Sequence, residues 1–139
     1  MVRPALLVLL CSAVLLADGI PKSEFKTRRV NLRKSLDGVM VLFGADEPQD
    51  LHNPFFQDTN FLYLSGWKEP GAVMILTSQE EMIFLPPRKP QEENFTGRKT
   101  LAEDGDAVDK TGFEKVLPRA AIESSFLRLM ESAHRVYSI

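Results

Sequence analysis

Three short runs of apolar residues limit the folds open to this chain more than any other feature. Residues 39–43, 72–76 and 82–85 contain no polar side chain. A strand of this kind must be covered on both faces, because successive side chains point to opposite faces of a sheet. The sequence therefore predicts a sheet that is flanked by helices.

Further elements follow from hydrophobic periodicity and from turn residues. Three more short strands are predicted, over residues 61–64, 113–117 and 136–139. Amphipathic helices are predicted over residues 23–36, where Ser23 is a suitable N-cap, and over residues 119–133. The polar turn between the second and third apolar runs suits a hairpin, and a hairpin makes the sheet mixed. The predicted fold is α/β, with a mixed sheet of about six strands flanked by helices.

Polar segments join these elements. Residues 44–56 and 91–112 are rich in turn-forming residues and are predicted to be loops. The first helix carries five basic residues, which we interpret as its solvated side: Lys26, Arg28, Arg29, Arg33 and Lys34. The 139 residues are 44% hydrophobic and 26% charged, as expected for one globular domain. A net charge of −2 leaves no basic excess to neutralise phosphates, which argues against nucleic acid as a partner.

The first residues have the pattern of a secretory signal. Arg3 precedes an apolar run over residues 5–17, and Ala17 and Gly19 place small residues at a possible cleavage site. As a helix this run would reach about 20 Å, well short of roughly 30 Å of bilayer hydrocarbon. We predict a signal peptide over residues 1–19, a domain over residues 20–139 and an exported protein. An uncleaved anchor and a core helix are the alternatives. Cleavage would remove Cys11, the single cysteine of the chain.

No pattern of catalytic or metal-binding residues stands out. Four possible ligands of one loop match no ligand spacing: Asp46, Asp50, His52 and Asp58. His134 is far from them, and no nucleophile elbow or phosphate loop occurs. The adjacent glutamates at residues 80–81 and 92–93 lie in predicted turns open to water, where carboxyl pKa values are seldom tuned for catalysis. We predict no catalytic residue, no metal ligand and no cofactor bound by this chain.

Aromatic residues gather between residues 55 and 67. Phe61 and Tyr63 are expected to share one face of the predicted strand and to pack in the core. Phe55, Phe56 and Trp67 flank turns instead. They are candidates for a subunit or domain interface, where aromatic residues are enriched.

In order along the chain, several segments resemble the aminopeptidase P N-terminal domain, also called the creatinase N-terminal-like domain. They are residues 24–29 (EFKTRR), 39–45 (VMVLFGA), 56–66 (FQDTNFLYLSG), 69–72 (EPGA), 84–88 (FLPPR) and 95–98 (FTGR). Each alone is a weak signal, but their combination is specific. Two positions depart from the pattern: Phe95 lies where many relatives carry tryptophan, and Phe56 lies where relatives often carry arginine.

The resemblance implies a six-stranded mixed sheet that precedes a metallopeptidase domain of the pita-bread fold. Enzymes of this family remove an N-terminal residue that precedes proline, so proline-containing peptides are the implied substrates. They use two divalent ions, usually manganese, held by two aspartates, a histidine and two glutamates of the C-terminal domain. No position of this sequence corresponds to those ligands. The N-terminal domain of the family builds a homo-oligomer and narrows the route to the active site, which adds Phe95 and Arg98 to the candidate contacts.

We therefore expect the N-terminal domain of an exported Xaa-Pro aminopeptidase, separated here from its catalytic domain and inactive alone. Two alternatives stay open: a stand-alone secreted interaction module, and the equivalent domain of a creatinase or proline-dipeptidase type hydrolase. The candidate residues for an interface or for substrate access are Phe55, Phe56, Trp67, Phe95 and Arg98.

Overall fold

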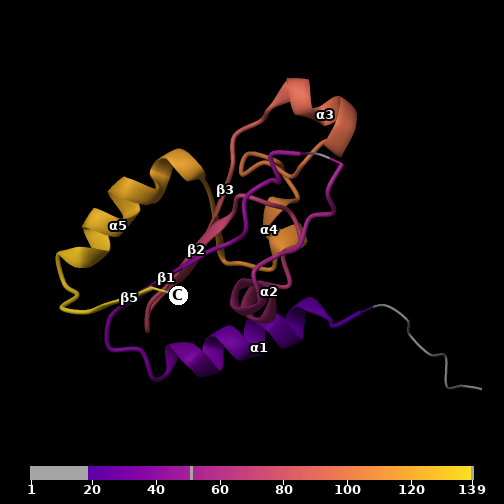
Figure 1. Ribbon diagram of the computed structural model, residues 1–139. Coiled ribbons are helices and arrows are strands. Elements are labelled where there is room, and N and C mark those ends of the chain that lie inside the picture. The colour runs from indigo at the N-terminus through magenta and orange to yellow at the C-terminus, as the bar shows by residue number, and fades with distance from the viewer. Residues whose placement is uncertain (1–18, 51, 139) are drawn as a thin grey trace, which may run out of the picture.

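The computed structural model describes residues 19–50 and 52–138, which form a five-stranded sheet with helices on its faces (Figure 1). The strands are β1 (Val39–Phe43), β2 (Val73–Leu76), β3 (Glu81–Leu85), β4 (Lys115–Pro118) and β5 (Val136–Ser138). Their order across the sheet is β4-β3-β2-β1-β5. Strand β2 is antiparallel to β1 and β3, whereas β4 is parallel to β3 and β5 is parallel to β1. The sheet is therefore mixed, as predicted.

Helices cover both faces of this sheet (Figure 1). Helices α1 (Lys22–Arg33) and α2 (Thr59–Ser65) lie on one face, and α5 (Ile122–Met130) lies on the other. A 3-10 turn, η1 (Arg119–Ala121), leads into α5, and α5 connects β4 to β5. Two short helices, α3 (Pro90–Thr96) and α4 (Ala107–Thr111), connect β3 to β4. In the part of the chain that the structure describes, no helix is long and apolar enough to cross a membrane.

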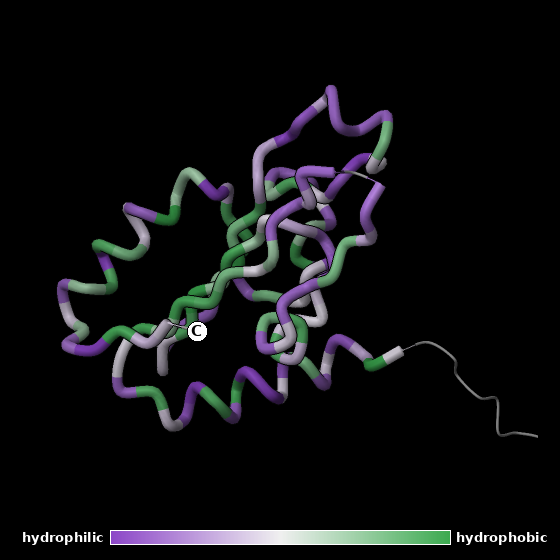
Figure 2. Tube along the Cα trace, in the orientation of Figure 1, coloured by the Kyte–Doolittle hydropathy of each residue, from purple (hydrophilic) through white to green (hydrophobic). Residues whose placement is uncertain are grey.

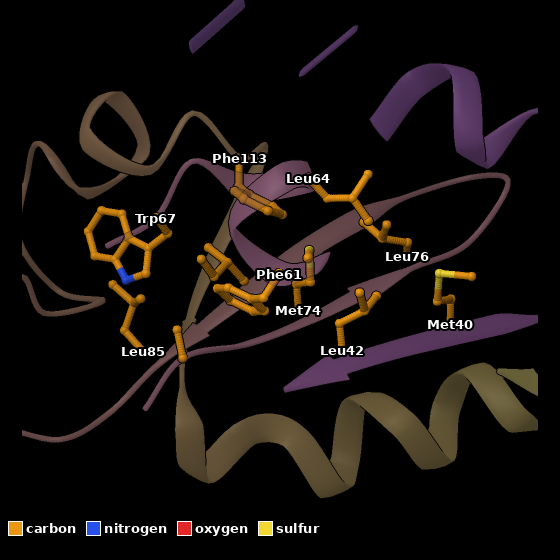
Figure 3. Close-up of a cluster of buried hydrophobic side chains, with 11 residues drawn as sticks. Met40, Leu42, Phe61, Leu64, Trp67, Met74, Leu76, Leu85 and Phe113 are labelled. Carbon is orange, nitrogen blue, oxygen red and sulfur yellow. The ribbon is translucent and has the colours of Figure 1, made fainter. Parts of the chain in front are cut away.

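The central strands are apolar because each face of the sheet contributes to a separate hydrophobic cluster. Figure 2 shows hydrophobic residues concentrated along the sheet. On the side of α2, the sheet presents Met40, Leu42, Met74, Leu76, Ile83 and Leu85 (Figure 3). On the side of α5, it presents Val39, Val41, Val73, Ile75, Met82 and Phe84. Alternate side chains of each strand thus enter different clusters, as the apolar runs predict.

Residues 61–64 are helical, so the strand predicted there is wrong. Asp58 Oδ1 accepts a hydrogen bond from the Phe61 backbone N–H at 2.9 Å and caps α2. Gly66 ends the helix with a φ of 66°, a conformation that favours glycine. Phe61 is buried, whereas Tyr63 is 57% exposed. These two aromatic residues therefore lie on different sides of α2, and the described sheet has five strands where about six were expected.

The segment predicted as a loop over residues 91–112 is also wrong in part, because it contains most of α3 and all of α4. Pro90 suits the first turn of α3, where no N–H partner is needed. The other predicted strands and both predicted helices overlap elements of the structure, with ends that differ by a few residues. The predicted signal segment lies outside the described residues, apart from Gly19.

A buried ion pair joins α1 to the sheet. The side chains of Arg29 and Glu81 are 1% and 0% exposed, and Arg29 Nε and Nη2 each lie 3.0 Å from a carboxylate oxygen of Glu81. Arg29 also donates to the carbonyls of Leu64 at 3.0 Å and Gly112 at 2.7 Å. Its guanidinium carbon lies 3.8 Å from the centre of the Phe113 ring. Arg29 is therefore not on the solvated side of α1, where the sequence pattern placed it.

Candidate interface at the carboxyl edge of the sheet

The carboxyl ends of β1, β3 and β4 lie at the same edge of the sheet, which we call the carboxyl edge. The loop after β1, the segment that contains α3, and η1 all leave the sheet there, and α3 projects beyond the strands (Figure 1). A cavity of about 230 Å³ lies among these segments. Open sheets with parallel strands commonly bind ligands at this edge, so it is the natural place for a functional surface.

Charged side chains that line this cavity face opposite charges. The four pairs are Arg88–Glu93, Lys89–Glu92, Lys99–Glu47 and Arg119–Asp46. Arg88 donates to both carboxylate oxygens of Glu93, at 2.7 and 2.9 Å, and this contact holds the pKa of Glu93 below its usual value. Burial lowers the pKa of Lys99. Because each of these charges has a partner, the cavity is better suited to binding than to proton transfer.

Gln57 connects the loop after β1 to the turn after α2. Its side-chain oxygen accepts hydrogen bonds from the backbone N–H groups of Ala45 at 2.7 Å and Asp58 at 3.0 Å. Its side-chain nitrogen donates to the carbonyls of Trp67 at 3.3 Å and Glu69 at 3.1 Å. Both ends of the amide are used, so a carboxylate or an apolar side chain could not replace it.

Glu69 extends this connection to the segment after α3. Its two carboxylate oxygens accept hydrogen bonds from the Thr100 N–H at 2.9 Å and the Thr100 hydroxyl at 3.0 Å. We call Gln57, Glu69 and Thr100 the edge network. The edge network ties together the two segments that carry the exposed aromatic residues of the carboxyl edge. Sequence reasoning did not identify it, although Gln57 and Glu69 lie in the segments that carry the family resemblance.

The predicted interface residues divide into exposed and buried ones. Phe56 is 78% exposed and Phe95 is 79% exposed, while Phe55 is half-buried. Arg98 is exposed and lies 2.7 Å from Asp104. Trp67 instead packs in the core cluster with Leu85 (Figure 3), and its indole N–H has no acceptor among the described residues. Packing thus accounts for Trp67, and the interface role stays a prediction for the other four.

The four possible ligands in the loop after β1 are not brought together. Asp58 caps α2, and Asp46 pairs with Arg119. Asp50 and His52 contact each other, since Asp50 Oδ1 lies 3.0 Å from the His52 N–H and 2.9 Å from its Nδ1. The backbone hydrogen bond from His52 lowers the pKa of Asp50. Over residues 19–50 and 52–138, no group of three histidine, cysteine or carboxylate side chains is arranged to hold a metal ion.

The fold and this edge define a small α/β domain that presents loops with exposed aromatic residues at one end of a mixed sheet. Comparison with known families gives a specific match: the sequence model for the aminopeptidase P N-terminal domain covers residues 25–137. The chain belongs to this family, as its sequence segments predicted.

Individual relatives agree with this assignment. The Xaa-Pro aminopeptidase of Haemophilus influenzae is 36% identical over 89 residues, which are 58% of this chain and 21% of that protein. Xaa-Pro aminopeptidase 3 of Dictyostelium discoideum is 34% identical over 99 residues, which are 64% of this chain and 19% of that protein. The structure of Pseudomonas aeruginosa aminopeptidase PepP matches with a TM-score of 0.70 and 31% identity, over 86% of this chain and 28% of that one.

The same fold occurs in a zinc-substituted Escherichia coli aminopeptidase P in complex with product. That match has a TM-score of 0.70 and 24% identity, over 85% of this chain and 29% of that one. The present chain thus spans less than a third of each of these proteins.

Proposed function

We propose that this chain is the N-terminal domain of an exported Xaa-Pro aminopeptidase, and that its carboxyl edge borders the active site of a catalytic domain. The observation that carries the proposal is Phe95, whose ring is 79% exposed on the segment that the edge network fixes. An exposed aromatic ring gains little in an isolated domain and much at an interface. The pattern of residues 1–19 supports export.

In this proposal, hydrolysis belongs to the catalytic domain. Two divalent ions, manganese in the expected enzyme, would be held there, and the zinc-substituted relative supports a metal-dependent reaction. The present chain supplies apolar surface from Phe95 and Phe56 and an exposed cation from Arg98, beside the path of a proline-containing peptide. A homo-oligomer would let this edge meet the active site of its own or of a neighbouring subunit.

The test is a chimera in which residues 25–137 replace the corresponding domain of Escherichia coli aminopeptidase P. Phe95→Ala should raise KM for a Xaa-Pro peptide about fivefold, as the loss of one buried interface contact does. Its melting temperature should not change, because an exposed ring contributes little to folding. The control is Leu127→Ala, which removes another exposed apolar side chain, 59% exposed on α5.

Two results would contradict the proposal. The first is an equal change in KM for Phe95→Ala and for the control Leu127→Ala. The second is metal-dependent hydrolysis of a Xaa-Pro peptide by the pure 139-residue chain with added manganese, because the reaction would then not require a separate catalytic domain.

A further inference from the structure

A groove of about 1030 Å³ opens between α1, α2 and the residues that precede α1. We call it the α1–α2 groove. In the described part of the chain, three aromatic side chains line it: Phe25, Tyr63 and Trp67. Trp67 is buried, Phe25 is half-buried and Tyr63 is 57% exposed. The α1–α2 groove therefore presents accessible apolar surface, and none of the described residues that line it also lines the carboxyl-edge cavity.

Arg28 holds the aromatic rings of this groove in place. Its guanidinium carbon lies 5.2 Å from the centre of the Phe25 ring and 4.4 Å from that of Tyr63. It also donates to the Tyr63 carbonyl at 3.1 Å and to Glu24 at 3.0 Å. Phe25 packs so closely on Gly66 that a Cβ atom there would lie 2.4 Å from its ring. Rings fixed in this way lose little entropy when a ligand binds.

The charged side chains that the structure describes in the lining of the α1–α2 groove all have one sign. Among residues 19–50 and 52–138, four cationic side chains and no carboxylate line it; the cations are Lys22, Arg28, Lys68 and Lys110. Arg28 pairs with Glu24 and Lys110 pairs with Asp106, but within the described residues Lys68 has no carboxylate partner. The carboxyl-edge cavity is different, since each of its cations faces a carboxylate. A positive groove in a chain of net charge −2 favours an anionic ligand.

We propose that the α1–α2 groove binds an acidic peptide segment of a partner protein. One large apolar side chain of that segment would pack on Tyr63 and Phe25, and its carboxylates would lie beside Lys68 and Lys110. A peptide fits better than a membrane surface, because the apolar side chains line a groove and do not form one exposed stripe along a helix. This proposal does not depend on the peptidase function, because the isolated chain is sufficient to test it.

The probe is a synthetic peptide of alternating glutamate and aspartate residues with one central phenylalanine, titrated into the full chain by calorimetry. We expect saturable binding that weakens as the salt concentration rises. Lys68→Glu should weaken binding about tenfold, because it replaces an attraction with a repulsion. Lys34→Glu makes the same charge change on exposed Lys34 outside the groove and should alter binding by less than about twofold. Tyr63→Ala should weaken binding of the phenylalanine peptide and leave its alanine analogue unaffected.

Several results would overturn the proposal and point to another occupant. Equal affinity for a lysine-containing peptide would show that charge does not select the ligand. Binding by residues 19–139 but not by the full chain would assign the groove to residues 1–18. Self-association that Lys68→Glu abolishes, without peptide binding, would assign it to a second copy. Binding to phosphatidylserine vesicles but not to the peptide would assign it to a membrane surface.

Discussion

At the scale of single residues, the pair Arg29–Glu81 decides how α1 lies on the sheet. Both side chains are enclosed, and the donors of Arg29 are distributed over Glu81 and two backbone carbonyls. Burial of an ion pair costs desolvation energy that the ionic contact only roughly offsets, so the pair specifies the position of α1 more than it adds stability. The sequence could not reveal it. Arg29 belongs to a run of basic residues that was predicted to face solvent. Glu81 follows another glutamate, in a segment that was predicted to be an exposed turn.

Glu81→Ala should lower the free energy of unfolding by about 3–5 kcal/mol, because it leaves Arg29 buried without an opposite charge. The control is Glu114→Ala, which removes an exposed pair with Lys26, and it should cost less than about 1 kcal/mol. Urea denaturation of the full chain measures both values.

If Glu81→Ala proves too unstable to purify, the double variant Arg29→Met/Glu81→Leu keeps the test possible. Removal of both charges should recover part of the loss, since the fully enclosed Arg29 charge is then gone and only Arg33, which is 11% exposed, loses its contact with Glu81. A double variant that is no more stable than Glu81→Ala would contradict the assigned role of the pair.

At the scale of elements, a strand or helix was predicted correctly where residues close together in the sequence determine its structure. Strands β1, β2 and β3 were predicted well because nearly all their side chains are buried, which leaves continuous apolar runs in the sequence. The run at residues 61–64 is equally apolar, but a run of four residues cannot distinguish a strand from a helix. The helix forms because Asp58 caps its start, Gly66 ends it and Phe61 packs beneath it.

We expect the cap to be measurable. Asp58→Ala should reduce the free energy of unfolding by about 1 kcal/mol, because the Phe61 N–H loses its acceptor. Asn60 is exposed and lies two residues after Asp58, in the first turn of α2. Asn60→Ala should change the free energy of unfolding by no more than a few tenths of a kcal/mol. Thermal and urea denaturation of both variants test this difference, and equal stability of the two would exclude a capping role for Asp58.

At the candidate site, too, contacts between segments that are distant in the sequence could not be predicted. Phe95 and Arg98 were named as candidates because the resemblance covers their segment of the chain; both are exposed, and their role at an interface stays a prediction. The edge network was not predicted, because the contact between Glu69 and Thr100 joins loops that are 31 residues apart. Such a contact depends on the path of both loops, and no local pattern encodes that path.

At the scale of the whole molecule, carboxylates attach the segment from β4 through α5 to β5 to the rest of the domain. Glu80, in the turn between β2 and β3, accepts hydrogen bonds from Lys115 on β4 and pairs with Arg128 on α5. Asp37, before β1, accepts hydrogen bonds from Tyr137 and Arg135. The contact with Lys115 lowers the pKa of Glu80, and the contact with Tyr137 lowers the pKa of Asp37.

Acid should therefore weaken this attachment. Both carboxyl pKa values are lower in the folded chain than their ordinary values of 4.5 for Glu80 and 3.8 for Asp37, so the unfolded chain binds protons first as the pH falls. The stabilisation is complete above those ordinary values and is lost as the pH falls through the lowered ones.

We expect the free energy of unfolding to fall in acid below about pH 4.5, and Glu80→Gln to reduce this pH dependence. Urea denaturation between neutral and acidic pH measures the slope. Glu123→Gln removes a carboxylate of α5 that makes neither contact and serves as the control. An unchanged slope in Glu80→Gln would show that other groups determine acid stability.

The pairing of β5 with β1 has a consequence for how the domain is made. Val39 pairs with Val136, so one neighbour of a wholly apolar strand is synthesised about 100 residues later in the chain. Until those residues emerge, β1 has an open edge to which another nascent chain can add. Pairing over such a separation is also slow to form. Synthesis of this domain therefore includes a vulnerable interval, and faster elongation between β1 and β5, or chaperone cover until β5 has emerged, should raise the yield of folded protein.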